Sequence, residues 1–185
     1  MRVIQTNLPE VLLLEPQVHG DARGFFCETY HQAKFAELGI SDSFVQDNHS
    51  QSRRHTLRGL HYQLRHPQAK LCRVVRGEVL DVAVDIRVGS PRFGRCVTAI
   101  LSAENKQQIY IPPGFAHGFV VLSESADFLY KCSDFYFPED ERGILWNDPD
   151  LAIPWGVADP LISEKDRAHL PLRAVPPEFL PRYGE

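Results

Sequence analysis

Fourteen prolines and twelve glycines divide this chain of 185 residues into short apolar runs. Proline and glycine tend to end or turn a regular element, so the runs between them are expected to be short strands. Residues 78–86 show the alternation typical of a half-buried strand, with Asp81, Ala83 and Asp85 between Leu80, Val82, Val84 and Ile86. Further strands are predicted at residues 71–75, 97–101, 108–111, 118–122 and 128–136. This spacing favours an all-β sandwich or barrel over a parallel α/β sheet.

Helices are expected to be few and short. Residues 31–38 form one candidate, which ends at Gly39, a residue suited to the left-handed cap. A second begins after Ser163 as N-cap, with Asp166 in its first turn. Prolines then recur at positions 171, 176, 177 and 181, so residues 173–185 are predicted to be a surface tail without regular structure. The domain itself is predicted to span residues 1–172.

Composition and length exclude several classes of function. The 20 Lys and Arg against 24 Asp and Glu give a net charge of −4, which argues against an extended surface for nucleic acid or acidic membranes. No apolar run approaches the roughly 20 residues that span a bilayer. The N-terminus has no hydrophobic signal core, so we expect a cytoplasmic protein. The four cysteines form no C-x-x-C pair, which fits reduced thiols better than a zinc site or a disulfide framework.

The segment of residues 58–63 places Arg58 and His61 three positions apart. Residues three apart on a regular strand face opposite sides, so a shared pocket requires a bulge, for which Gly59 is a candidate. An imidazole titrates near pH 6.5 and can act as a general base. A hydrogen-bonded structural histidine explains His61 equally well, and these residues alone leave both interpretations open.

Residues 109–119 resemble the second motif of the cupin barrel, in which P-x-G is followed after two residues by a histidine that points into the barrel. That histidine is His117 here. Metal-binding cupins also present H-x-H in their first motif, whereas this chain has His61-Tyr62-Gln63. Glutamine is a poor ligand for a transition metal, so we predict a barrel without a metal site.

Lys70 and Tyr130 each allow two interpretations. Lys70 stands at the start of a predicted strand, where most lysines extend into solvent. An ammonium held inside a barrel would instead stabilise a developing oxyanion or a phosphate. Tyr130 follows Phe128 and Leu129, a pattern typical of core packing, although a buried hydroxyl can also donate a proton.

Taken in order along the chain, these motifs resemble the dTDP-4-dehydrorhamnose 3,5-epimerases. The resemblance extends from about residue 12 to residue 172. It rests on the segments 23–26 with Glu28, 46–48, 58–63, Lys70, 113–119, 130–131, 141–143, 146–149 and 161–166. The resemblance implies a cupin-type double-stranded β-helix, or jelly-roll barrel, and an enzyme without metal or cofactor.

The same resemblance implies a reaction and its catalytic residues. The family inverts C3 and C5 of dTDP-4-dehydro-6-deoxy-D-glucose through an enolate, giving dTDP-4-dehydro-L-rhamnose. His61 matches the family's base and Tyr130 its acid. Lys70 matches the cation that stabilises the oxyanion at O4, and Asp166 matches the carboxylate that pairs with the base.

Substrate binding and assembly are also implied by the family. The positions that match dTDP contacts are Arg23, Glu28, Gln46, Asn48 and Arg58. The other positions around the substrate are His117, Tyr136, Glu141 and Lys165. In the family the thymine pocket borrows residues from a neighbouring subunit, including those near Arg23 and Glu28. A homodimer is therefore expected.

Three other functions remain open from the sequence. A C3-only or C5-only epimerase for a related dTDP-4-keto-deoxysugar would keep the same base, lysine and tyrosine. A sugar-nucleotide-binding cupin without turnover would more plausibly lack the base or the acid. A metal-dependent cupin oxygenase would require stoichiometric iron, zinc or manganese.

Overall fold

The structure is a computed structural model, and it describes residues 1–184. Its strands are β1 (Arg2–Gln5), β2 (Leu12–Glu15), β3 (Val18–Asp21), β4 (Gly24–Cys27), β5 (Gln46–Arg53), β6 (Leu57–Gln63), β7 (Lys70–Arg76), β8 (Glu78–Asp85), β9 (Cys96–Ser102), β10 (Gln108–Ile111), β11 (Phe115–Val121), β12 (Ser125–Cys132) and β13 (Glu141–Gly143). The helices are α1 (Gln32–Glu37), α2 (Glu164–Arg167) and two 3-10 turns, η1 (Leu172–Ala174) and η2 (Pro177–Phe179). The predicted all-β class, with its few short helices, is confirmed.

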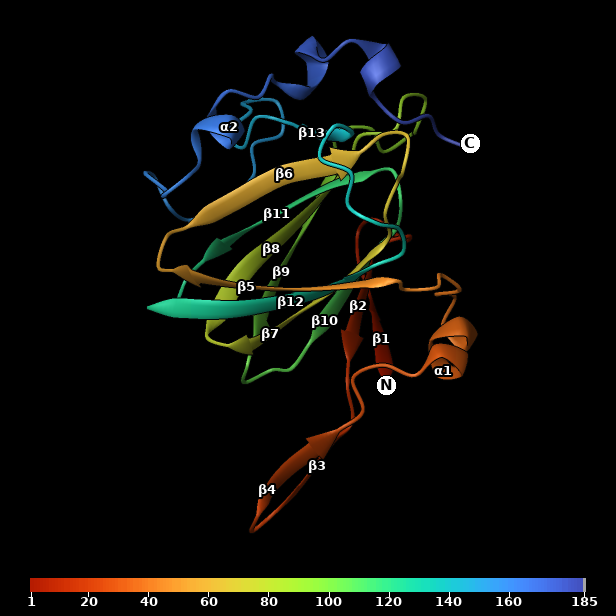
Figure 1. Cartoon of the computed structure of the whole chain (residues 1–185), viewed down its shortest axis with the longest axis vertical. Helices are drawn as coiled ribbons and strands as arrows, with labels where there is room; N and C mark the ends of the chain where they lie inside the picture. Colours follow the sequence, from red (N-terminus) through yellow and green to blue (C-terminus); the bar gives the residue numbers. More distant parts are fainter. Residues whose placement is uncertain (185) are drawn as a thin grey trace.

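All strands except β3 and β4 form two antiparallel sheets that face each other (Figure 1). One sheet has the order β1-β2-β10-β7-β12-β5, and the other has the order β13-β6-β11-β8-β9. Strands that follow one another in the sequence often do not pair with each other. Strand β11, for example, lies between β6 and β8. Such crossovers between two sheets are typical of a jelly roll.

The main core fills the space between the two sheets. Phe119 on β11 and Phe128 on β12 stack across that space with ring centroids 4.2 Å apart. Both rings are buried, and an aromatic pair of this kind adds about 1 kcal/mol beyond the area it buries. Aliphatic side chains of β8, β9 and β10 complete this cluster. This packing holds the two sheets at a fixed separation.

Strand β8 is buried on both faces, whereas its alternation predicted a half-buried strand. Val79 and Ala83 face the core between the sheets, so Asp81, which shares their side of the strand, also points inward. Val82 and Val84 pack on the opposite face against the C-terminal residues. The prediction of a solvent-facing side was wrong because the side that carries Asp81 and Ala83 faces the space between the two sheets.

The C-terminal residues also differ from the predicted unstructured tail. They form η1 and η2, and Leu180 is buried on the outer face of the five-stranded sheet. The Tyr62 hydroxyl donates to the Phe179 carbonyl at 2.8 Å, and residues 88 and 182 form a bridge. Proline suits the first turn of such short helices, and the apolar residues between the prolines cover the sheet. The domain boundary at residue 172 stays a prediction.

Helix α1 and the β3–β4 hairpin lie outside the two main sheets. Helix α1 ends just before Gly39, as predicted, and packs through Phe35 on the outer face of the six-stranded sheet. The β3–β4 hairpin extends away from the barrel (Figure 1). Its Phe25 and Phe26 are 65% and 69% exposed. Within the described residues, no helix has the length and apolar character needed to cross a membrane.

Candidate active site

A cavity of about 560 Å³ opens between the two sheets. It is lined by His61, Tyr130, Lys70, Asp166, Gln46, Asn48, Arg58, His117, Tyr136, Glu141 and Lys165, together with apolar residues such as Phe119 and Phe128. These are all the residues predicted for the site except Arg23 and Glu28. The fold therefore brings into one cavity groups that lie more than a hundred positions apart in the chain.

A bulge in β6 places Arg58 and His61 on the same cavity, as the sequence required. His117 of β11 lies opposite His61, and Phe119 lies opposite Arg58, so two residues of β6 face only one residue of β11. Gly59 has φ +116°, and a Cβ there would lie 2.6 Å from the Gly118 Cα. Only glycine fits this close backbone approach.

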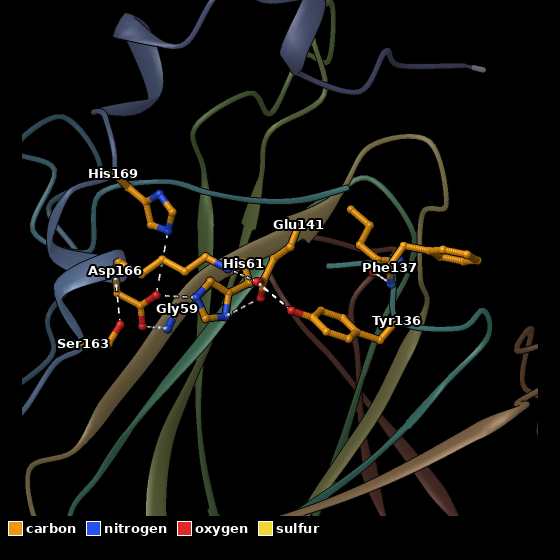
Figure 2. Close-up of polar contacts among 10 residues, drawn as sticks. Gly59, His61, Tyr136, Phe137, Glu141, Ser163, Asp166 and His169 are labelled. Atoms are coloured by element: carbon orange, nitrogen blue, oxygen red, sulfur yellow. Dashed lines mark hydrogen bonds and ion pairs between the residues drawn. The ribbon is translucent and has the colours of Figure 1, made fainter. Parts of the chain in front are cut away.

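His61 and Asp166 form a hydrogen-bonded pair (Figure 2). The His61 Nε2 lies 2.6 Å from Asp166 Oδ1, and the backbone N–H of Gly59 donates to Oδ2 at 3.3 Å. The backbone N–H of Asp166 donates to Ser163 Oγ, which confirms the predicted N-cap. Burial raises the pKa of Asp166, but the bonds and charge of His61 and the Gly59 N–H outweigh it and lower that pKa. The carboxylate therefore holds a proton on Nε2 and leaves Nδ1 as the basic nitrogen.

Glu141 lies on the other side of the His61 ring (Figure 2). Its Oε1 is 3.9 Å from His61 Nδ1, while Oε2 pairs with the Lys165 ammonium and accepts from the Tyr136 hydroxyl at 3.0 Å. Burial acts to raise the pKa of Glu141, but Lys165, His61 and Tyr136 together lower it. Two carboxylates thus flank the ring, and both favour a positive charge on it after it takes a proton.

Lys70 and Tyr130 lie on the opposite wall. His61 belongs to β6 of the five-stranded sheet, whereas Lys70 begins β7 and Tyr130 lies on β12 of the six-stranded sheet. Burial raises the pKa of Tyr130 to about 12, and the nearby thiols and Glu141 act in the same direction. The phenol therefore carries its proton at neutral pH. An imidazole and a protonated phenol thus face one cavity from opposite sides.

A second histidine–aspartate pair was missed by sequence reasoning. His117 Nε2 lies 2.9 Å from Asp81 Oδ2, and Asp81 is completely buried. Burial lowers the pKa of His117, although Asp81 opposes this effect, and the charges of Lys70 and His61 add to it. The available signal was a pair of aspartates on one face of an otherwise apolar strand, which we interpreted as a face toward solvent.

Comparison with known proteins decides the family. The family model described as dTDP-4-dehydrorhamnose 3,5-epimerase matches residues 5–174. A dTDP-4-dehydrorhamnose 3,5-epimerase of Pseudomonas aeruginosa is 61% identical over 169 residues, which cover 90% of this chain and 93% of the relative. The chain belongs to the dTDP-4-dehydrorhamnose 3,5-epimerase family. It is therefore an isomerase of the epimerase class.

Solved structures agree with this assignment and with the predicted cupin-type barrel. The dTDP-6-deoxy-D-glucose-3,5-epimerase of Legionella pneumophila, in complex with dTDP-4-keto-L-rhamnose, superposes with a TM-score of 0.97. It is 52% identical, and the match covers 100% of this chain and 99% of that one. A 3′-monoepimerase of Streptomyces bikiniensis in complex with dTDP-quinovose is 34% identical, with a TM-score of 0.89 over 97% of this chain and 92% of that one.

Arg23 and Glu28 lie apart from the cavity of this epimerase. Arg23 stands at the turn of the β3–β4 hairpin and binds Asp21, and Glu28 pairs with Lys34. Within one copy of the chain these two residues contribute nothing to the cavity. Their contact with the nucleotide stays a prediction.

Among residues 1–184 of this epimerase, two clusters each bring three side chains that could bind a metal within 4.8 Å of one another. One consists of His61, Asp166 and His169, and the other of Cys72, Asp81 and His117. In each cluster the carboxylate already bonds an imidazole nitrogen. Burial, aided by Asp81, raises the pKa of the Cys72 thiol well above its ordinary value, so it is not the thiolate that metals bind. The donor chemistry fits hydrogen-bonded acid–base pairs better than metal sites.

Proposed function

We propose that this chain inverts C3 and C5 of dTDP-4-dehydro-6-deoxy-D-glucose, giving dTDP-4-dehydro-L-rhamnose for dTDP-L-rhamnose synthesis. One observation carries the proposal. A carboxylate-paired histidine stands on one wall of a cavity, and a protonated tyrosine and a lysine stand on the opposite wall. Inversion of a carbon next to a ketone requires a base and an acid on opposite faces of the sugar ring.

In the proposed reaction His61 Nδ1 takes the proton from the carbon next to the C4 ketone. The electron pair of the broken C–H bond moves into the ring and places negative charge on O4. Lys70 stabilises this oxyanion, because one well-placed donor to such a charge contributes roughly 3 kcal/mol. Tyr130 then gives its proton to the other face of the same carbon, and solvent restores both groups. Repetition at the second carbon completes the double inversion.

The remaining cavity residues suit a sugar nucleotide. Arg58 presents a guanidinium at the cavity and also donates to Ser52 Oγ at 3.1 Å. A planar guanidinium can meet two diphosphate oxygens at once. We assign Gln46, Asn48, His117, Tyr136, Glu141 and Lys165 to contacts with the nucleotide and the sugar.

We further propose that the epimerase works as a cytoplasmic homodimer. The hairpin that carries Arg23 exposes Phe25 and Phe26, a pair of large apolar side chains that a second subunit would cover. Docking of that hairpin would deliver Arg23 and Glu28 to the nucleotide site of the neighbour. The expected assembly needs no metal or cofactor.

The first experiment is proton NMR of dTDP-4-dehydro-6-deoxyglucose with the enzyme in deuterated water, following the C3 and C5 signals separately. Loss of both signals, followed by formation of dTDP-L-rhamnose with a reductase, supports the proposal. Loss of one signal would identify a mono-epimerase, which the structural likeness to a 3′-monoepimerase favours as the second candidate. Loss of neither, with dTDP still bound, would identify a binding protein.

Two variants test the assignment of base and acid. His61→Ala should abolish deuterium uptake at both carbons. Tyr130→Phe should retain some uptake, because the base remains, but should lose productive inversion. Wild-type exchange in His61→Ala would show that another group is the base.

A further inference from the structure

His169 lies beside the His61–Asp166 pair and is not among the residues that line the cavity (Figure 2). Its ring meets the His61 ring edge-on, with centroids 6.2 Å apart. Its Nε2 lies 3.8 Å from Asp166 Oδ1, the same oxygen that His61 binds at 2.6 Å. The distance is about 1 Å longer than an ordinary N–H···O bond.

The His169 ring is held in this position by its neighbours. A Cβ on Gly143 of β13 would overlap the ring, so the absence of a side chain there makes room for it. The residue after His169 is also held, because the Leu170 carbonyl accepts a hydrogen bond from the backbone N–H of Leu145. The Nε2 atom is buried, and within residues 1–184 it has no hydrogen-bond partner. An unpaired buried N–H is costly, so an approach to Asp166 is favourable.

Charged groups surround His169 on each element packed against it. They are Asp166 and Lys165 on α2, His61 on β6 and Glu141 on β13. Burial and the charges of His61 and Lys165 lower the pKa of His169, and the two carboxylates only partly oppose them. His169 is therefore neutral at pH 7, and it can offer Asp166 an N–H without a competing charge.

We propose that His169 is a positioning residue for the epimerisation, acting through the Asp166 oxygen that it shares with His61. The neutral N–H of His169 stabilises the carboxylate and weakens its hold on the protonated His61 ring. His61 then releases its proton more readily and is ready to act again as a base. This inference rests on the proposed function, because it concerns the base of that reaction.

The test compares His169→Phe, which keeps a flat ring without an N–H, with His169→Gln, which keeps an N–H donor that does not titrate. The exposed His55 offers a control, His55→Asn, in which an imidazole outside the cavity is removed. Two quantities are measured for each protein. One is the acid limb of kcat/KM against pH, and the other is the NMR titration midpoint of the His61 ring in the free enzyme.

For His169→Phe we expect both midpoints to rise by roughly half a pH unit, because the Asp166 carboxylate loses a weak attraction to the ring N–H 3.8 Å away. His169→Gln and His55→Asn should stay near the wild-type values. The inference is overturned if neither His169 variant shifts the midpoint, if both shift it equally, or if only KM changes. The His61 titration needs no substrate, so it separates a failure of this inference from a failure of the proposed function.

Discussion

Replacement of Asp166 by asparagine removes one charge and almost no volume, so it isolates the electrostatic role of this carboxylate. In the wild type, Oδ1 accepts from His61 and Oδ2 accepts from the Gly59 N–H. Asparagine has only one acceptor oxygen, so one of these two contacts must meet an NH2 group instead. The variant therefore loses the charge beside His61 and one of the two bonds.

The expected loss follows from the geometry. His61 Nε2 and Asp166 Oδ1 lie 2.6 Å apart, so the centres of the imidazolium and carboxylate charges lie about 4 Å apart. At that separation the attraction is about 4 kcal/mol for an effective dielectric constant near 20. The amide oxygen of the asparagine can still accept a hydrogen bond from His61. Neutral hydrogen bonds are weaker than charged ones by about 1–2 kcal/mol, and this difference sets the lower limit of the expected loss. A barrier raised by about 1–4 kcal/mol slows proton removal by roughly 5-fold to 1,000-fold.

The assay is the rate of deuterium uptake at C3 and C5 under saturating substrate. Asp148→Asn is a suitable control, because Asp148 is equally buried and accepts from the Leu172 N–H, but lies outside the cavity. That control should lose stability and keep the exchange rate. A fall of less than about threefold in a folded Asp166→Asn protein, or an equal fall in both variants, would refute the electrostatic argument.

Three further perturbations test other parts of the structure. Lys70→Ala should lower kcat by roughly 10²-fold to 10³-fold, because the developing oxyanion loses its cation; a change confined to KM would make Lys70 a binding residue. Gly59→Ala should destabilise the fold by about 2 kcal/mol or more, since the new Cβ would lie 2.6 Å from the Gly118 Cα at φ +116°; an unchanged melting temperature would contradict the bulge. Asp85→Asn should cost about 3 kcal/mol at pH 7, because Asp85 is completely buried in an ion pair with Arg87.

The Asp85 prediction also has a pH dependence with a definite sign. Burial acts to raise the pKa of Asp85, but the bonds from Arg87 and Ser90 outweigh it, so the folded pKa lies below the ordinary value of 3.8. The carboxylate therefore stabilises the fold above pH 4, and this contribution is lost as the pH falls through the folded pKa. Denaturant unfolding of the wild type and Asp85→Asn at pH 7 and pH 3 should show a smaller difference at pH 3. An equal difference at both values would argue against the charge.

The local features of the fold could be predicted because they depend on neighbouring residues. Strand β10 occupies the predicted residues 108–111, and β7 and β9 extend only slightly beyond their predicted bounds. Ser163 caps α2 through a hydrogen bond to a residue three positions later. The bulge at Gly59 could also be inferred, since Arg58 and His61 cannot share a cavity on a regular strand.

Residues of the site could be predicted only where they belong to a recognisable sequence motif. His61, Lys70, Tyr130 and Asp166 were found through their order along the chain, and the cavity contains all four. Asp81 and His169 belong to no such motif. Asp81 resembled the polar side of a surface strand, and His169 followed a short helix in a region that was expected to lead into a loose tail.

The sequence by itself determined the β class, the short helices and the chemical groups available to the site, because alternation, turns and caps act over a few residues. Only the tertiary structure decided which groups meet. His61 and Asp166 are 105 positions apart, and His117 and Asp81 are 36 apart. Their contacts depend on which strands pair and on what covers each sheet face. Those arrangements arise from burial of the whole chain, and no local pattern encodes them.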